Sequence, residues 1–322
     1  MQRGPEQSLR RAKLTMIELT PLSEDSASEA WETYQACAGD VSYYFDIAVE
    51  RFAASLFEPP QVQPASIHHA AEASVIARET GHPVGWIQAG YLDGVASVPP
   101  GERDALIRGV FVEPGRQDVA DRLLRHAVNV LARDPYRKWR ALEHNCGYTF
   151  AAGMGRGPQR MTDVVLPLKA LGFQSEEDNH VYAAERLENR PQRDDHADID
   201  IQFLPGGWSE VNGFVRWDQF YFHEHGQTVG YATVVPVSRL TDSPTEETLF
   251  MKGIAVSPQC QRRGIGYLIM RTVWDHYRKH GINRILLNTG DQNFVAQKFY
   301  RNIGFELTDI ITSYDAEKLT TD

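Results

Sequence analysis

A glycine-containing loop with two arginines is the first stretch of this sequence whose residue types and spacing could support chemistry. It reads QRRGIG, from Gln261 to Gly266, and lies between an apolar segment closed by Pro258 and a segment with helical spacing of apolar residues. Backbone N–H groups at a helix start bind anions, and glycine lets a phosphate approach without a Cβ in the way. Arg262 and Arg263 add positive charge. The loop predicts a pyrophosphate site, although a tight turn that only packs a helix against a strand would have the same pattern.

A tyrosine on the next expected helix could supply a proton. INRILLNT, from Ile282, has the apolar run of a buried strand, and DQNFVAQKFYRNIGF then has helical spacing that ends at Gly304. Asp291 or Asn293 could cap this helix. Tyr300 lies on it, and a phenol pKa of about 10 is close enough to a thiol pKa of about 8.5 for proton donation to a departing thiolate. The alternative is an aromatic side chain that only fills the core.

The loop and the helix together resemble the GNAT superfamily of acyl-CoA-dependent N-acyltransferases. The loop is similar to the family's pyrophosphate loop, Gln/Arg-x-x-Gly-x-Gly/Ala, and the pattern Asn-x-x-Ala-x-x-Phe-Tyr that ends at Tyr300 is similar to the helix carrying its general acid. Order and spacing agree from Val229 to Phe305. The resemblance implies an α/β (α+β) fold, with a mixed, mostly antiparallel twisted sheet flanked by helices, and acetyl-CoA as cosubstrate.

The resemblance also implies roles for individual residues. Tyr300 would be the general acid, and the backbone N–H of Ile254 would hold the thioester carbonyl and stabilise the oxyanion that forms when an amine attacks. No metal is implied. The residues that would bind acetyl-CoA are Ile254, Ala255, Val256, Gln261, Arg262, Arg263, Gly264, Ile265, Gly266, Asn293, Ala296 and Phe299.

The general base is left open by the sequence. A substrate ammonium with a pKa of about 10 must lose a proton before it can attack. Family members often use a Glu on or before the fourth strand, but the matching strand here carries Met251 and Lys252 and no carboxylate. We take Glu247 as the working candidate. The full set of nearby alternatives is Glu246, Glu247, His223 and His225.

The elements around the loop occur twice in the chain. KGIAVSP from Lys252 matches RGVFVEP from Arg108, and GQTVGYATV from Gly226 matches GHPVGWIQA from Gly81, at nearly the same separation. A third pair, LKALGF and YRNIGF, lies closer together, so the first copy contains an insert. Ordered matches of this kind predict a duplication, similar to the family's tandem-domain members. We expect a disordered leader at 1–15, a degenerate GNAT-like domain at 16–185, a linker at 186–198 and an acyl-CoA-binding catalytic domain at 199–322.

The first copy lacks the residues that would bind the cosubstrate in the second. Asp118 would place a carboxylate where a pyrophosphate should bind, and like charges repel. Leu168, preceded by Pro167, stands where the second copy has Tyr300. We therefore expect the first unit not to bind acyl-CoA in the usual way. The expected insert is the glycine-rich stretch CGYTFAAGMGRGPQRM from Cys146, as a pocket rim or as a flexible segment.

Composition excludes some classes of protein. The chain has 322 residues, of which 42% are hydrophobic and 24% charged, and a formal net charge of −10. These values are typical of a globular protein, and the acidic balance argues against a nucleic-acid partner. No apolar run approaches the roughly 20 residues of a membrane-spanning helix. Three scattered cysteines indicate a reduced, cytoplasmic compartment.

The sequence therefore predicts an acetyl-CoA-dependent N-acetyltransferase. Its active site would lie in the C-terminal unit, and its acceptor would be the primary amine of a small molecule or a peptide. The alternative is a non-catalytic acyl-CoA-binding sensor or regulatory module, because the sequence offers no evident base. Neither a nucleic acid nor a membrane is expected as a partner.

Overall fold

The computed structural model describes most of the chain. The described residues are 16–39, 41, 43–58, 66–93, 101–144, 146–151, 155–188, 198–209, 216–243 and 247–319. The predicted leader at 1–15 and residues 189–197 of the predicted linker lie outside them. None of the described helices is long and apolar enough to cross a bilayer.

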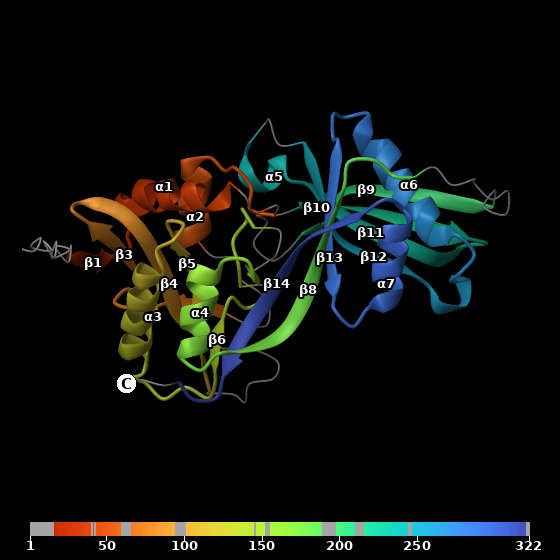
Figure 1. Cartoon of the computed structure of the whole chain (residues 1–322). Helices are drawn as coiled ribbons and strands as arrows, with labels where there is room; N and C mark the ends of the chain where they lie inside the picture. Colours follow the sequence, from red (N-terminus) through yellow and green to blue (C-terminus); the bar gives the residue numbers. More distant parts are fainter. Residues whose placement is uncertain are drawn as a thin grey trace, which may run out of the picture.

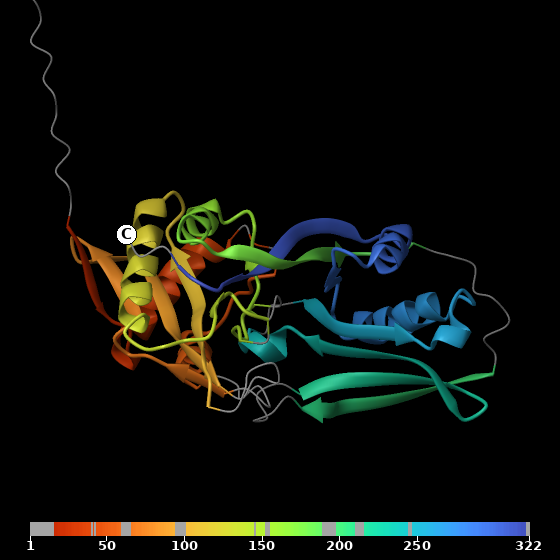
Figure 2. The same ribbon diagram turned by 90° about the horizontal axis from the view of Figure 1, so that it is seen from below.

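A single 14-stranded sheet runs through both halves of the molecule (Figures 1 and 2). Its order is β1-β3-β4-β5-β6-β14-β8-β13-β12-β11-β10-β9, with β2 paired to β4 and β7 to β14. The strand bounds are β1 Ile17–Pro21, β2 Ser66–His69, β3 Val75–Glu79, β4 His82–Asp93, β5 Asp104–Val112, β6 Trp139–Ala141, β7 Gly157–Pro158, β8 Gln174–Ala184, β9 Ile199–Ser209, β10 Arg216–Glu224, β11 Gln227–Pro236, β12 Thr248–Val256, β13 Arg284–Gly290 and β14 Glu306–Ala316.

Helices cover the sheet. They are α1 Ala27–Ala38, α2 Val49–Phe57, α3 Gln117–Leu131, α4 Thr162–Ala170, α5 Ser238–Thr241, α6 Ile265–Arg278 and α7 Phe294–Asn302, with short 3-10 turns at Glu24–Ser26 and Pro258–Cys260. Parallel pairing within the described strands is confined to β5 with β6 and β12 with β13, and each of these pairs is joined by a helix, α3 or α6. The expected mixed, mostly antiparallel sheet flanked by helices is confirmed.

The repeated stretches from Gly81 and Gly226 each form the second strand of a hairpin, and the two hairpins have the same turn. Thr80 and Gly81 connect β3 to β4 with φ values of 50° and 85°, and His225 and Gly226 connect β10 to β11 with φ values of 50° and 77°. Two consecutive left-handed residues are typical of the tight turn whose twist matches that of the flanking strands. The repeat detected in the sequence therefore corresponds to a repeated hairpin.

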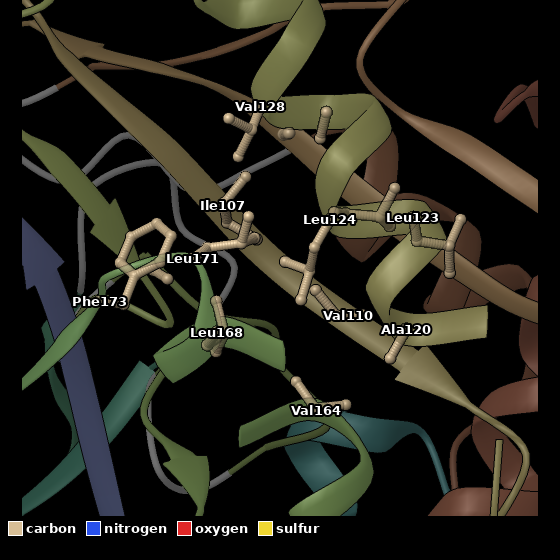
Figure 3. Packing of buried hydrophobic residues seen from close by; sticks show 14 of the residues in the cluster. Ile107, Val110, Ala120, Leu123, Leu124, Val128, Val164, Leu168, Leu171 and Phe173 are labelled. Atoms are coloured by element: carbon tan, nitrogen blue, oxygen red, sulfur yellow. The ribbon is translucent and has the colours of Figure 1, made fainter. Parts of the chain in front are cut away.

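One of the core clusters of the N-terminal half is built from helices α3 and α4 on one face of β5 (Figure 3). Leu124 and Val128, one helical turn apart on α3, pack toward Ile107 and Val110 of β5. Leu168 of α4 is fully buried in the same cluster. The position that matches Tyr300 in the repeat therefore serves packing in this half.

The two halves exchange their last strands. Strand β8 leaves the N-terminal half and pairs with β13, and β14 leaves the C-terminal half and pairs with β6. The two exchanged strands also pair with each other, from Glu306↔Ala183 to Asp315↔Gln174. Figure 1 shows β8 and β14 side by side as they link the halves. The repeat did not predict this exchange, and the domain boundaries at 185 and 199 stay a prediction.

Candidate active site

A gap opens between two parallel strands of the C-terminal half. Strands β12 and β13 pair from Thr248↔Arg284 to Met251↔Leu287, and the two strands do not pair with each other beyond that point. The register between β11 and β12 shifts at the same level, which leaves Lys252 as an extra residue. Such a bulge bends its strand and ends regular pairing. The edge of residues 253–256 that faces β13 is therefore not engaged in the sheet.

A pocket of about 990 Å³ lies on the side of this gap that α6 and α7 cover. It brings together residues from β12, the loop before α6, and the first turns of α7. From the residues predicted in the sequence, it collects Ile254, Ala255, Val256, Gln261, Arg262, Gly264, Ile265, Gly266, Asn293, Ala296, Phe299 and Tyr300. Two predicted residues, Arg263 and Glu247, do not line it.

The glycine loop forms the start of helix α6. Gly264 has a φ of 90° and is the N-cap, so the free N–H groups of the first helical turn follow it. Arg262 also has a positive φ, 63°, and lines the pocket. At Gly266 an added Cβ would lie 3.3 Å from the ring of Phe299, so this glycine lets α7 pack closely on α6. The loop thus presents a helix N-terminus and one arginine to the pocket.

The second arginine of the loop points elsewhere. The Nη1 atom of Arg263 donates to the carboxylate of Glu224 on β10 at 2.9 Å, and this partner raises the pKa of the guanidinium. Gln261 lies nearer the gap and donates from Nε2 to the carbonyl of Val256 at 3.3 Å. The sequence predicted that Arg262 and Arg263 both add positive charge at the pyrophosphate site. In the structure only Arg262 lines the pocket, and Arg263 points toward β10.

Tyr300 is buried beside the gap. Asn293 caps α7, because its side chain accepts from the N–H of Ala296 at 3.2 Å, which decides between the two capping candidates. Tyr300 is 5% exposed, and its hydroxyl has no hydrogen-bond partner within the described residues. Burial raises the pKa of Tyr300 to about 12. The phenol is therefore protonated at neutral pH.

The structure keeps Glu247 away from the pocket. It precedes β12, and its carboxylate accepts a hydrogen bond from the side chain of Asn283. Ile254 lies seven positions further along the chain, which is roughly 20 Å along a strand. Glu246 lies outside the described residues. The working candidate for the base is thus not brought to the site.

The two histidine candidates are also outside the pocket lining. His223 lies on the exposed side of β10, where its ring contacts the hydroxyl of Thr228 at 3.2 Å. His225 occupies the hairpin turn with a φ of 50°. The geometry therefore supports none of the described candidates as a base at this pocket.

The corresponding gap of the N-terminal half is filled by its own chain. Strands β5 and β6 pair only from Ala105 to Ile107, and a register shift leaves Arg108 as the extra residue, as Lys252 is in β12. At Gly253 an added Cβ would meet nothing within 4 Å, but at the matching Gly109 it would lie 2.6 Å from the hydroxyl of Tyr148. Tyr148 therefore occupies the space that stays open in the C-terminal half.

Hydrogen bonds hold the segment that carries Tyr148 in place, and we call Tyr148 in this gap the plug. Arg108, 1% exposed, donates to the carbonyls of Cys146 and Gly147 and to Gln88 Oε1, each at 2.8 Å. Its guanidinium lies 4.1 Å from the ring centroid of Tyr148. The sequence predicted this insert to be a pocket rim or a flexible segment. Its first residues instead belong to the buried core. The aromatic residues within CGYTF were the signal for it.

The helix start of the N-terminal half already holds a carboxylate. Asp118 lies in the first turn of α3 and pairs with Arg116 at 3.0 Å, and this hydrogen bond holds the pKa of the carboxyl below its usual range. Gly115, with a φ of 84°, is the left-handed residue of this loop. The negative charge expected from the sequence is therefore present at the end of α3 where a pyrophosphate would bind.

Several pocket residues were not identified from the sequence. Most of them follow helical spacing along one side of α6, and the others come from β9, from the 3-10 turn before α6 and from α7. Arg271 and Asp275 among them pair with each other at 2.8 Å. The spacing alone was the available signal, because these positions carry no motif. The additional residues are Ile201, Cys260, Tyr267, Leu268, Arg271, Thr272, Asp275 and Val295.

Comparison with known sequences finds matches to part of the chain. The model of the Acetyltransferase (GNAT) family matches residues 180–305. A mycothiol acetyltransferase from Cellulomonas flavigena is 30% identical over 110 residues, which are 33% of this chain. The matched region spans 30% of the length of that relative.

Comparison with solved structures extends over both halves. A tandem GNAT protein from the clavulanic acid biosynthesis pathway has a TM-score of 0.60 and 14% identity, covering 94% of this chain and 98% of its own. A GCN5-related N-acetyltransferase from Sphaerobacter thermophilus has a TM-score of 0.57 and 11% identity, covering 94% and 96%. At these identities the likeness concerns the fold. The C-terminal half therefore matches the Acetyltransferase (GNAT) family over residues 180–305, and the fold of the whole chain is similar to that of tandem GNAT proteins.

Proposed function

We propose that this protein transfers an acetyl group from acetyl-CoA to a primary amine, in the pocket of its C-terminal half. The observation that carries the proposal is the separation of β12 from β13 beside a pocket that contains a helix N-terminus and a protonated tyrosine. The family match covers this half of the chain. Acyl transfer from a thioester requires an anion site, an oxyanion donor and a proton for the departing sulfur, and the pocket offers residues for each.

The residues of the pocket fit the chemistry of acetyl-CoA. The helix start at Gly264 supplies N–H groups and the positive end of a dipole for the pyrophosphate, with Arg262 in the same lining. Ile254 and Val256 are half-buried apolar residues that suit the pantetheine arm, and their backbone N–H groups are donors for the arm and the thioester carbonyl. A volume of about 990 Å³ is that of a site for a large ligand.

Tyr300 supports catalysis as the general acid. Its burial keeps the hydroxyl protonated at neutral pH, so a proton is available when the thiolate departs. A thiolate released in equally dry surroundings also has a raised proton affinity: in this chain, burial raises the pKa of the Cys146 thiol to about 12. Matched pKa values let a proton pass from the phenol to sulfur without a large uphill cost.

The N-terminal half supports the reaction without binding acyl-CoA. Tyr148 fills its gap, Asp118 repels a pyrophosphate, and Leu168 replaces the tyrosine. Its strand β8 instead completes the sheet beside β13. We therefore assign one acetyl-CoA site to each chain, and a small-molecule or peptide amine as the acceptor.

Thiol release from acetyl-CoA against a panel of amines tests the proposal. We expect release that depends on the amine and is lost in Gly264→Asp, in which a carboxylate faces the pyrophosphate. Calorimetry should give one acetyl-CoA per chain. Binding of acetyl-CoA without thiol release for any amine would favour a sensor or regulatory module. The observation that supports this alternative is the absence of Glu247 from the pocket. An undiminished affinity in Gly264→Asp would refute the loop as the anion site.

A further inference from the structure

The acceptor must reach the gap from the face of the sheet opposite the acetyl-CoA pocket. Helices α6 and α7 and the pocket between them occupy one face, toward which Met251 and Ile254 pack. Phe250 points to the other face, where it packs in a cluster with Trp217 and Leu286. Because the cosubstrate would fill the first face, the amine has to attack through the second.

Lys252 lies on this second face, at the level of the gap. It is the extra residue of the bulge in β12, directly after the last pair with β13 and before Gly253, where the space is open. Its Nζ lies 4.9 Å from the ring centroid of Trp217, on the face of Phe250. The amine is half-buried and two residues away from Ile254.

We propose that Lys252 is the general base that deprotonates the acceptor ammonium, an inference that rests on acetyl transfer at this pocket. In the neutral form, its Nζ takes a proton from the ammonium. The acceptor nitrogen then attacks the thioester carbonyl, so that a C–N bond forms. The C–S bond breaks, and the nitrogen loses its second proton to solvent. Tyr300 protonates the thiolate, and the proton on Lys252 passes to solvent, which also returns one to Tyr300.

The ionisation of Lys252 suits this role. Burial lowers the pKa of Lys252 to about 8, so a useful fraction of the amine is neutral near physiological pH. An ionisable group that interacts electrostatically with Lys252 comes from the segment between β6 and β7. Burial and the charges of Arg156 and Lys252 lower the pKa of His144 to about 3, and its Nδ1 accepts from Arg156 at 2.7 Å. The histidine therefore stays neutral, and Trp217 carries no charge.

The repeat provides an internal comparison. The N-terminal half has Arg108 at the matching bulge, and arginine does not titrate in proteins. There the guanidinium donates the hydrogen bonds that hold the Tyr148 plug in place. A titratable amine at this position therefore occurs only in the half whose gap is open, within the part of the chain that the structure describes.

The test compares Lys252→Met and Lys252→Arg with the parent protein, from about pH 6 to about pH 10. Both variants keep the apolar stem that covers Trp217. We expect kcat/KM with an alkylamine to fall about 100-fold or more, as for loss of a general base. The rise of the parent profile near pH 8 should disappear. Affinity for acetyl-CoA, which binds on the other face, should be unchanged. Lys169→Met, at an exposed lysine of α4, is the matched control.

An aromatic amine as the acceptor tests whether Lys252 acts as a base or only as a structural residue. Such an amine is already neutral at pH 7, so Lys252→Met should cost far less with it than with an alkylamine. An equal loss with both amines, or an unchanged pH profile, would overturn the role of Lys252 while leaving acetyl transfer intact. If the parent protein released no thiol with any amine, the proposed function itself would fail.

Discussion

The ring of Tyr182 lies 5.9 Å from the ring of Tyr300, centroid to centroid, although the two residues belong to different halves of the repeat. Tyr182 is fully buried on β8, the strand that the N-terminal half contributes to the C-terminal sheet. Phe305, 5.7 Å away, is a further aromatic neighbour of Tyr300. The candidate acid is therefore positioned by both halves of the molecule.

Tyr182 should matter for packing and little for hydrogen bonding. Tyr182→Ala should lower the free energy of unfolding by about 3–5 kcal/mol, because it empties a large buried volume. Tyr182→Phe should change it by less than about 1 kcal/mol, since the hydroxyl has no partner within the described residues. Urea denaturation of both variants tests this. A large loss in Tyr182→Phe would mean that the hydroxyl is bonded in solution.

Tyr300→Phe should separate binding from chemistry. The ring and its contacts remain, so the affinity for acetyl-CoA should change little, whereas kcat should fall by about 100-fold or more because the thiolate loses its proton donor. Calorimetry and thiol release measure the two effects. Equal turnover in both proteins would remove Tyr300 from the mechanism. Phe299→Leu, which alters the contact on Gly266, should instead weaken binding.

Two matched glycine substitutions test the plug. Gly109→Ala should lower the free energy of unfolding by about 1–3 kcal/mol, because the new methyl group would collide with the hydroxyl of Tyr148. Gly253→Ala meets open space and should leave stability nearly unchanged. The same substitution narrows the gap beside β12 and should reduce turnover. Similar stability of the two variants would show that the gaps are alike, against the assignment of one site to each chain.

The buried carboxylate of Asp218 should make stability depend on pH. It accepts from Arg239 at 2.9 Å, from the N–H of Gly206 at 2.7 Å and from the hydroxyl of Tyr277. Burial would raise the pKa of Asp218, but these bonds outweigh it and hold the pKa below 3.8. The carboxylate thus stabilises the fold above the unfolded-state pKa, and this contribution is lost as the pH falls through the folded-state value.

Asp218→Asn tests this contribution. At pH 7 the variant should be less stable by about 3 kcal/mol, because a buried charge pair loses one partner. The difference from the parent protein should shrink below about pH 4, where Asp218 of the unfolded parent chain takes up a proton. Urea denaturation at both pH values measures it. A difference that is constant between neutral and acidic pH would contradict the assigned ionisation of Asp218.

Features with a local cause could be predicted from the sequence. The cap of α7 depends on neighbouring residues only, and the sequence pattern indicated Asn293 as one of two candidates for it. The pocket loop was found because several residues of one short stretch line the same site. Tertiary partners were not predictable in this way. The pairing of Arg263 with Glu224 depends on how α6 lies over β10, and no motif encodes it.

The plug and the base show the same limit. Tyr148 could not be placed from the insert, because glycine-rich composition indicates a loop and says nothing of where its aromatic side chains pack. Glu247 was selected for its chemistry, but the direction of β12 carries it to the opposite end of the strand. Lys252 was overlooked because the face of a residue in a bulge does not follow the alternation of a regular strand.

The strand exchange also constrains how the molecule can be made. Strand β6 pairs with β14, which the ribosome produces after every other described strand, so the N-terminal sheet cannot be completed while the C-terminal half is still being synthesised. Contacts between such distant segments slow folding, because a long loop must close before they form. Neither half is therefore a removable module. A gene fragment encoding the C-terminal half alone would lack β8, the strand that carries Tyr182 to the site.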